Sequence, residues 1–130
     1  MTVFVDTSFY VALIMPRDQW HARAVRAMRP SMRMFTSAPV ITETISLLQS
    51  RGLLSTALQF LSGIRDNSEL TIIYPDAATQ VTAWQRFAKL AGTGANGVDS
   101  MSFVIMEQLA IRKALSFDQH FRSAGFETLP

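Results

Sequence analysis

The sequence predicts a three-layer α/β/α fold, in which helices cover both faces of a central, mostly parallel sheet of four to five strands. Two observations predict this class. Short apolar runs alternate along the chain with longer stretches of helical character. Most of these runs also lack the in–out alternation of strands that face water, which is typical of strands covered on both faces. In such sheets, ligands bind at the carboxyl ends of the strands.

The strands are predicted from short apolar runs bounded by polar or turn-forming residues. The first run ends directly at Asp6, and the third is rich in β-branched residues. Gly125 leads into the last, which is short. We expect strands at 3–5, 32–36, 70–74, 114–117 and 126–129.

The helices are predicted from their capping and terminating residues. Pro16 stops the first helix, Pro39 suits the first turn of the third, and Gly52 ends that helix. Asp18 and Asp76 are the predicted N-caps of the second and fifth helices. We expect helices at 7–15, 19–28, 39–51, 55–65, 77–90 and 99–113, a helical turn at 121–123, and a flexible loop at 92–97.

Composition excludes several classes of protein. The 130 residues suit one domain, 1–130, and 48% hydrophobic against 17% charged residues argues against disorder. The absence of cysteine excludes a disulfide framework, a thiolate zinc site and a cysteine nucleophile. The apolar run 9–15 follows no basic segment and is too short to cross a bilayer, so we expect a cytoplasmic protein without membrane contact.

Two acidic residues follow predicted strands. Asp6 comes directly after the first strand and Asp118 after the fourth, so both are expected at the carboxyl edge of the sheet. Each could instead simply cap the helix that follows it, which Asp does well.

Two further acids lie on predicted helices. Glu43 shares a helix face with Val40 and Leu47, and Asp99 shares one with Phe103 and with other apolar residues. A carboxylate on a core-facing side is costly unless it is paired or coordinated. For Asp99 the alternative is an ordinary helix N-cap.

A cluster of these four acids would carry enough negative charge to raise some pKa values or to require a cation. Oxygen ligands without cysteine favour Mg²⁺ or Mn²⁺ over zinc. Such an ion can activate water toward a phosphodiester, which is the chemistry of a metal-dependent nuclease.

Four segments of the chain resemble a known family over essentially its whole length. They are VFVDTSFYVALIMPRDQWH, TETISLL, GVDSMSFVIM and ALSFDQHFRSAGFETLP. Together they are similar to the PIN-domain ribonucleases, and in particular to the VapC-type toxins of toxin–antitoxin pairs. The resemblance implies a PIN-like fold and a catalytic, metal-binding set formed by Asp6, Glu43, Asp99 and Asp118.

The resemblance also implies one or two Mg²⁺ or Mn²⁺ ions, cleavage of single-stranded or loop RNA, a homodimer and a cognate antitoxin partner. Three positions depart from the family pattern. Val98 stands where Thr or Ser is expected, Asn96 where Ser is frequent, and Ser116 where Thr is common. His120 belongs to the resembling segment and is a possible general base, and Ser8 could cap the first helix or bond the acids.

Two other functions are alternatives. The chain could be a non-catalytic PIN-like module that binds RNA or protein, which the four intact acids disfavour. A phosphoacceptor domain would want an acceptor Asp after the third strand and paired acids near the N-terminus, and Asp6 has no acidic neighbour. The GTGANG match to a dinucleotide fingerprint follows a helix instead of a strand, so it fails in context.

The basic residues are mostly arginine. Arg23, Arg26, Arg29 and Arg33 form a basic group that is either a solvated face or a contact for phosphate or for an acidic antitoxin segment. If four of the ten acids converge on a metal, six face the twelve basic residues elsewhere. That balance suits a polyanionic substrate.

Overall fold

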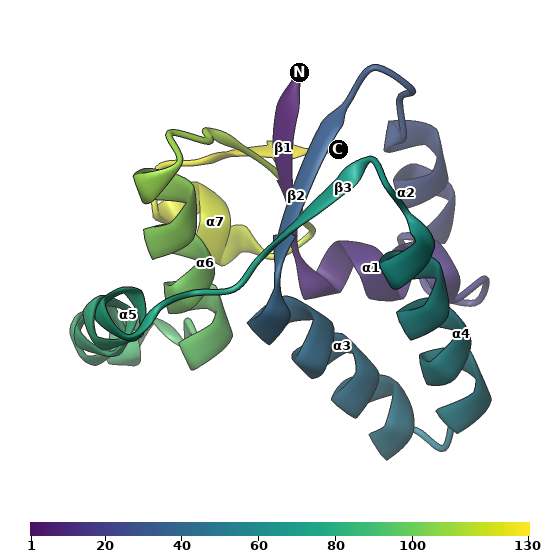
Figure 1. Cartoon of the computed structure of the whole chain (residues 1–130), viewed down its shortest axis with the longest axis horizontal. Coiled ribbons are helices and arrows are strands. Elements are labelled where there is room, and N and C mark those ends of the chain that lie inside the picture. Colours follow the sequence, from purple (N-terminus) through teal and green to yellow (C-terminus); the bar gives the residue numbers. More distant parts are fainter.

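The structure, a computed structural model, describes all 130 residues and contains one five-stranded sheet (Figure 1). The strand order is β3-β2-β1-β4-β5, and every neighbouring pair is parallel. The expected α/β class is therefore confirmed, and the sheet is entirely parallel where a mostly parallel one was predicted. The strands are β1 (Thr2–Val5), β2 (Arg33–Ser37), β3 (Leu70–Ile73), β4 (Lys113–Leu115) and β5 (Glu127–Leu129).

Helices lie on both sides of this sheet. Figure 1 shows α1, α2 and α4 on one side and α6 and α7 on the other, with α5 packed outside α6. This three-layer arrangement brings the ends of β1 and β4, and the starts of α1, α6 and α7, to one edge of the sheet. The helices are α1 (Thr7–Ile14), α2 (His21–Ala27), α3 (Ala38–Ser50), α4 (Leu54–Asp66), α5 (Ala77–Leu90), α6 (Gly97–Gln108) and α7 (Gln119–Ser123).

Each side of the sheet has its own aromatic packing. Tyr10 of α1 meets Phe60 of α4 edge-on, with ring centres 5.0 Å apart. Phe103 of α6 meets Phe121 of α7 in the same manner at 5.0 Å. Burying such side chains contributes roughly 1.5–3 kcal/mol each, so both helical layers are held firmly against the strands that carry the acids.

The predicted boundaries of one helix were wrong. The helix expected at 99–113 begins at Gly97 and ends at Gln108. Ala110 adopts a left-handed backbone (φ 56°), which turns the chain out of the helix. Lys113, predicted as helical, instead pairs with Val3 and Glu127 in the sheet.

Two smaller predictions also need correction. Asp18 does not cap α2 directly, because the helix begins at His21 and the Asp18 carboxylate accepts a hydrogen bond from the Trp20 backbone N–H at 2.8 Å. The loop predicted at 92–97 contains a short 3₁₀ turn (Ala91–Thr93) and a left-handed Gly94 (φ 88°). No helix has the length and apolar character needed to cross a membrane.

Candidate active site

Asp6 is held at the end of β1 by two serines. Its Oδ2 accepts a hydrogen bond from Ser8 Oγ at 2.8 Å, another from the Ser8 backbone N–H at 3.3 Å, and a third from Ser116 Oγ at 3.0 Å. Asp6 is also the N-cap of α1. The two interpretations of this residue, helix cap and site acid, are therefore compatible, since capping uses one oxygen and leaves Oδ1 without a protein donor.

Ser8 and Ser116 connect the first strand to the fourth. The Phe117 backbone N–H donates to Ser8 Oγ at 2.9 Å, and the Asp118 backbone N–H donates to Ser116 Oγ at 3.0 Å. Each hydroxyl thus accepts from the chain after β4 while donating to Asp6. This pair of bridges fixes Asp6 and Asp118 relative to each other.

Asp99 and Asn96 form a capping box at the start of α6. The Asn96 side chain accepts from the Asp99 backbone N–H at 2.8 Å, and Asp99 Oδ2 accepts from the Asn96 backbone N–H at 2.9 Å. Asp99 was predicted as a possible N-cap. Instead Asn96 is the cap, and Asp99 stands three residues further on, 4% exposed, with Oδ1 free of protein donors.

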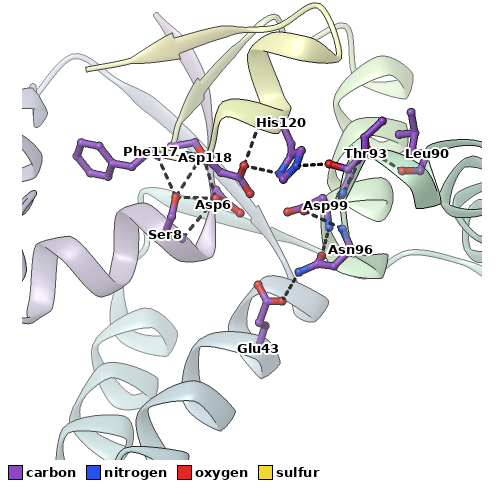
Figure 2. A network of polar contacts seen from close by, with 12 residues as sticks. Asp6, Ser8, Glu43, Leu90, Thr93, Asn96, Asp99, Phe117, Asp118 and His120 are labelled. Carbon is purple, nitrogen blue, oxygen red and sulfur yellow. Dashed lines mark hydrogen bonds and ion pairs between the residues drawn. The ribbon is translucent and has the colours of Figure 1, made fainter.

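His120 lies between Asp118 and the 3₁₀ turn that contains Thr93 (Figure 2). Asp118 Oδ1 accepts from the His120 backbone N–H at 2.9 Å and lies 2.6 Å from His120 Nδ1. His120 Nε2 donates to the Thr93 carbonyl at 3.0 Å. Because this carbonyl only accepts, Nε2 carries a proton, and the carboxylate beside Nδ1 favours a second one.

Glu43 lies on α3 at the margin of this group. The expectation that it faces the core with Val40 and Leu47 was wrong in part. Val40 is buried, whereas Glu43 is only half-buried. Its Oε2 accepts from the Asn96 side-chain amide at 3.4 Å, which links α3 to the start of α6 (Figure 2).

Burial dominates the electrostatics of the two inner acids. Loss of solvation raises the pKa of Asp6 to about 6. The hydrogen bond from Ser8 lowers this pKa, and the negative charge of Asp99 raises it further. Burial likewise raises the pKa of Asp99 to about 6. The hydrogen bond from the Asn96 backbone lowers this pKa, whereas the negative charges of Asp118 and Glu43 raise it further. All four predicted acids therefore interact through Asp99.

The Thr93 carbonyl raises the pKa of the His120 imidazole, and the Asp118 carboxylate adds to this shift. Both contacts favour the imidazolium form. These contacts therefore favour His120 as a cationic partner of Asp118 over His120 as a general base, the role that the sequence analysis considered.

The donor set fits a hard divalent cation. Each of the four acids commits one oxygen to protein donors and leaves the other without one. Possible ligand atoms of Asp99, Asp118 and His120 lie within 4.8 Å of one another, and Asp6 and Glu43 stand outside this group. In its imidazolium form His120 has no lone pair to offer, which leaves the carboxylates of Asp99 and Asp118 as the ligands within the group. Carboxylate oxygens with few nitrogen donors are the ligands that Mg²⁺ and Mn²⁺ prefer.

One contributing residue was not predicted in its observed role. Asn96 was noted only as a departure from a family pattern, yet it connects Glu43 and Asp99. The N-x-x-D spacing of a capping box could have indicated it. The contact between Asn96 and Glu43 joins residues 53 positions apart and left no signal in the sequence.

Comparison with known proteins places this geometry in context. The family model described as PIN domain matches residues 3–127. The chain is 33% identical over 126 residues to the curated 23S rRNA-specific endonuclease VapC20 of Mycobacterium tuberculosis, covering 95% of both chains.

Solved structures share the fold. The crystal structure of M. tuberculosis VapC20, described as a sarcin–ricin loop cleaving toxin, matches with a TM-score of 0.88 and 31% identity, covering 98% of this chain and 99% of that one. VapBC-1 from nontypeable Haemophilus influenzae matches with a TM-score of 0.65 and 14% identity, covering 98% and 96%, a likeness of fold alone.

Proposed function

This chain belongs to the PIN domain family, and from that premise we propose that it is a metal-dependent endoribonuclease that acts as the toxin of a toxin–antitoxin pair. The observation that carries the proposal is a set of four acids at one edge of the sheet, in which Asp6, Glu43 and Asp118 each interact with Asp99 and each acid keeps one oxygen free of protein donors. Helix capping accounts for one oxygen of each buried acid, and the second oxygen of Asp6 and of Asp99 stays free for a metal ion.

We assign the four acids to one or two Mg²⁺ or Mn²⁺ ions. When bound, such an ion lowers the pKa of water and offsets charge on phosphate oxygens. Ser8 and Ser116 orient Asp6 through Oδ2, which leaves Oδ1 free of protein donors. Asn96 does the same for Glu43 and Asp99. His120 balances the charge of Asp118 and holds the Thr93 turn beside it.

The proposed substrate is single-stranded or loop RNA. Support comes from VapC20, which is named for cleavage of 23S rRNA and of the sarcin–ricin loop. With a third of the residues identical over nearly the whole chain, a sarcin–ricin stem-loop is the first RNA to test.

An apolar groove is the proposed site of an antitoxin. It encloses about 460 Å³ between α1 and α4, and ten of its fourteen lining residues are hydrophobic, among them Phe9, Leu13, Phe60 and Ile64. A groove of this kind accepts the apolar face of a helix from a partner protein. Co-purification with the product of an adjacent small gene, and its loss in Leu13→Glu, would test this assignment.

A stripe on α5 is the proposed homodimer surface. Val81, Trp84 and Phe87 are exposed on the helix, Trp84 by 62%, and Tyr74 is exposed just before it. The stripe contains no charge, so a second copy can cover it without repulsion, as a two-fold interface requires. Sedimentation should give a dimer for the wild type and a monomer for Trp84→Glu.

The enzymatic proposal is tested by digestion of a sarcin–ricin stem-loop and of total RNA with Mg²⁺, Mn²⁺ or EDTA, with the cleavage ends mapped. Wild type should cut only with metal, and Asp6→Asn and Asp99→Asn should not cut. Asp66→Asn, at an exposed acid at the end of α4, is the matched control and should cut as wild type does. Equal product from all four proteins would remove the metal-site proposal.

A further inference from the structure

A basic surface on α2 and the turn after it has no role in the proposed chemistry. Arg23, Arg26 and Arg29 line one hollow of about 410 Å³, together with Met32 and the two chain ends. No Asp or Glu side chain lines this hollow. We call these three residues the arginine surface. Arg33, the fourth of the predicted basic group, is not among the lining residues and stacks over Phe35.

The arginines of this surface have no acidic partner in the protein. Arg86 forms the chain's single Arg–carboxylate ion pair, with Glu107 of α6. Arg29 donates instead to the backbone carbonyls of Arg26 and Met28, which holds its guanidinium at the end of the helix. All three arginines are exposed. Their charges are therefore available to an external anion, and a guanidinium pairs with phosphate through two parallel hydrogen bonds.

An aromatic stack connects the arginine surface to the catalytic edge. The Trp20 ring lies parallel to Phe117 with centres 5.3 Å apart, and Phe117 in turn stacks on Phe9 at 6.0 Å. The Arg23 guanidinium carbon lies 5.2 Å from the Trp20 ring centre and 5.9 Å from that of Phe117. These cation–π contacts fix Arg23 at the end of the surface nearest the acids.

Phe117 is the residue between Ser116 and Asp118. Its backbone N–H donates to Ser8 Oγ inside the site, while Figure 2 shows its ring pointing away from the carboxylates. The same residue therefore faces the acid cluster with its backbone and supports Arg23 with its ring. Arg23 is thereby linked to the residue next to Asp118, while Arg26 and Arg29 continue the surface toward Met1 and Met32, which precede β1 and β2.

We propose that the arginine surface binds the phosphate backbone of the RNA substrate on one side of the cleavage position, with Arg23 as the contact nearest the acids. This inference rests on the proposed function for the identity of the polyanion. Contacts to phosphate position a nucleic acid without reading its sequence, so the surface supplies affinity and register and leaves base choice to residues around the acids.

The test is RNA binding in EDTA, where no cleavage occurs, measured by fluorescence anisotropy over a range of salt concentrations. R26Q/R29Q is the main variant, because neither residue contacts the aromatic stack. R51Q/R65Q removes the same charge from exposed positions at the ends of α3 and α4 and is the matched control. R26K/R29K keeps the charge while removing the paired guanidinium geometry.

We expect R26Q/R29Q to weaken binding about tenfold for all RNA sequences and to lower the slope of log K against log salt by about 1.4, the value for two single-strand phosphate contacts. The control should match wild type, and R26K/R29K should keep the wild-type slope. R23Q should raise KM for cleavage with kcat nearly unchanged. Melting temperatures close to wild type would exclude misfolding as the cause.

Wild-type affinity and slope in R26Q/R29Q would overturn the inference. So would loss of antitoxin binding with RNA binding intact, which would assign the surface to an acidic protein segment. The two proposals fail separately: arginine-dependent RNA binding without metal-dependent cleavage removes only the enzymatic proposal, and cleavage indifferent to the arginines removes only this one.

Discussion

The acid cluster contains two unlike pairs. Asp6 and Asp99 are 3% and 4% exposed, and burial raises the pKa of each to about 6. Glu43 and Asp118 are half-buried, and water reaches both. Two close carboxylates without solvation are costly at neutral pH, whereas hydrated ones cost little. We therefore expect the buried, inner pair to depend most on a bound cation, and we expect Asp118 of the half-buried, outer pair, whose carboxylate lies in one group with that of Asp99, to contribute to the same site.

The largest expected effect is on the inner pair. Asp6→Asn or Asp99→Asn should each lower kcat/KM for RNA cleavage by at least about 1,000-fold, equivalent to about 4 kcal/mol of transition-state stabilisation. The neutral amide keeps the size and one acceptor, so the fold should survive, as circular dichroism can verify. A loss below tenfold would contradict the central position of this pair.

Substitution of the outer pair should have a smaller effect. Glu43→Gln and Asp118→Asn should each lower kcat/KM by about 10- to 100-fold, because water can replace a hydrated carboxylate on the proposed metal more easily than a buried one. Titration with Mn²⁺ should recover part of the loss, because weakened metal affinity is its main cause. If either outer variant is as damaged as Asp6→Asn, the distinction between the pairs is wrong.

Neutralising an inner acid should raise the free energy of unfolding of the metal-free protein, although it lowers activity. A carboxyl with a folded-state pKa near 6 and an ordinary value of 3.8 binds its proton more tightly when folded. The metal-free protein should therefore lose stability as pH rises from about 4 to 6 and change little from this cause above 6. At pH 8 in EDTA, Asp6→Asn should be more stable than wild type by on the order of 1–3 kcal/mol.

Thermal denaturation with and without metal measures this directly. Added Mg²⁺ or Mn²⁺ should raise the melting temperature of the wild type, more at pH 8 than at pH 5, because protons compete for the same oxygens. Asp6→Asn should lose most of this gain. If the metal-free wild type is most stable at pH 8, the deprotonated carboxylates of Asp6 and Asp99 do not destabilise the fold and the prediction is wrong.

Removal of Asn96, which connects Glu43 of the outer pair to Asp99 of the inner pair, should have the next largest effect. Asn96→Ala removes the α6 cap and the bond to Glu43, and should cost about 1 kcal/mol of stability and several-fold in activity. Asn96→Ser should restore the cap and most of the stability. Asn67→Ala, at the exposed C-cap of α4, serves as the control and should leave activity unchanged.

The smallest expected effect is at Val98, beside the inner pair. A hydroxyl here, as in Val98→Thr, should change activity by no more than a few-fold, because Asp99 Oδ2 is already satisfied by Asn96. Steady-state cleavage assays can resolve such a change. A gain of tenfold or more would indicate that the missing hydroxyl limits metal binding.

Local sequence determined much of the fold. All five strands and the six longer helices lie where apolar runs and capping residues predict them, with errors of a few residues at their ends. The largest error, at the end of α6, arose because Lys113 is helix-compatible by propensity but pairs in the sheet once β4 docks on β1. Pairing of distant strands overrides a local preference of this size.

For the site, the sequence by itself determined which acids stand at the carboxyl edge, because a parallel strand directs the residue after it to that edge. Apolar neighbours on predicted helix faces added Glu43 and Asp99, the family resemblance implied the same four acids, and the roles of all four stay predictions. Only the tertiary structure decided that Asp6 is buried while Glu43 is half-open, that two serines join Asp6 to Asp118, and that an aromatic stack sets Arg23 beside them. Burial and hydrogen bonding between residues a hundred positions apart depend on how layers pack, and no local pattern encodes that.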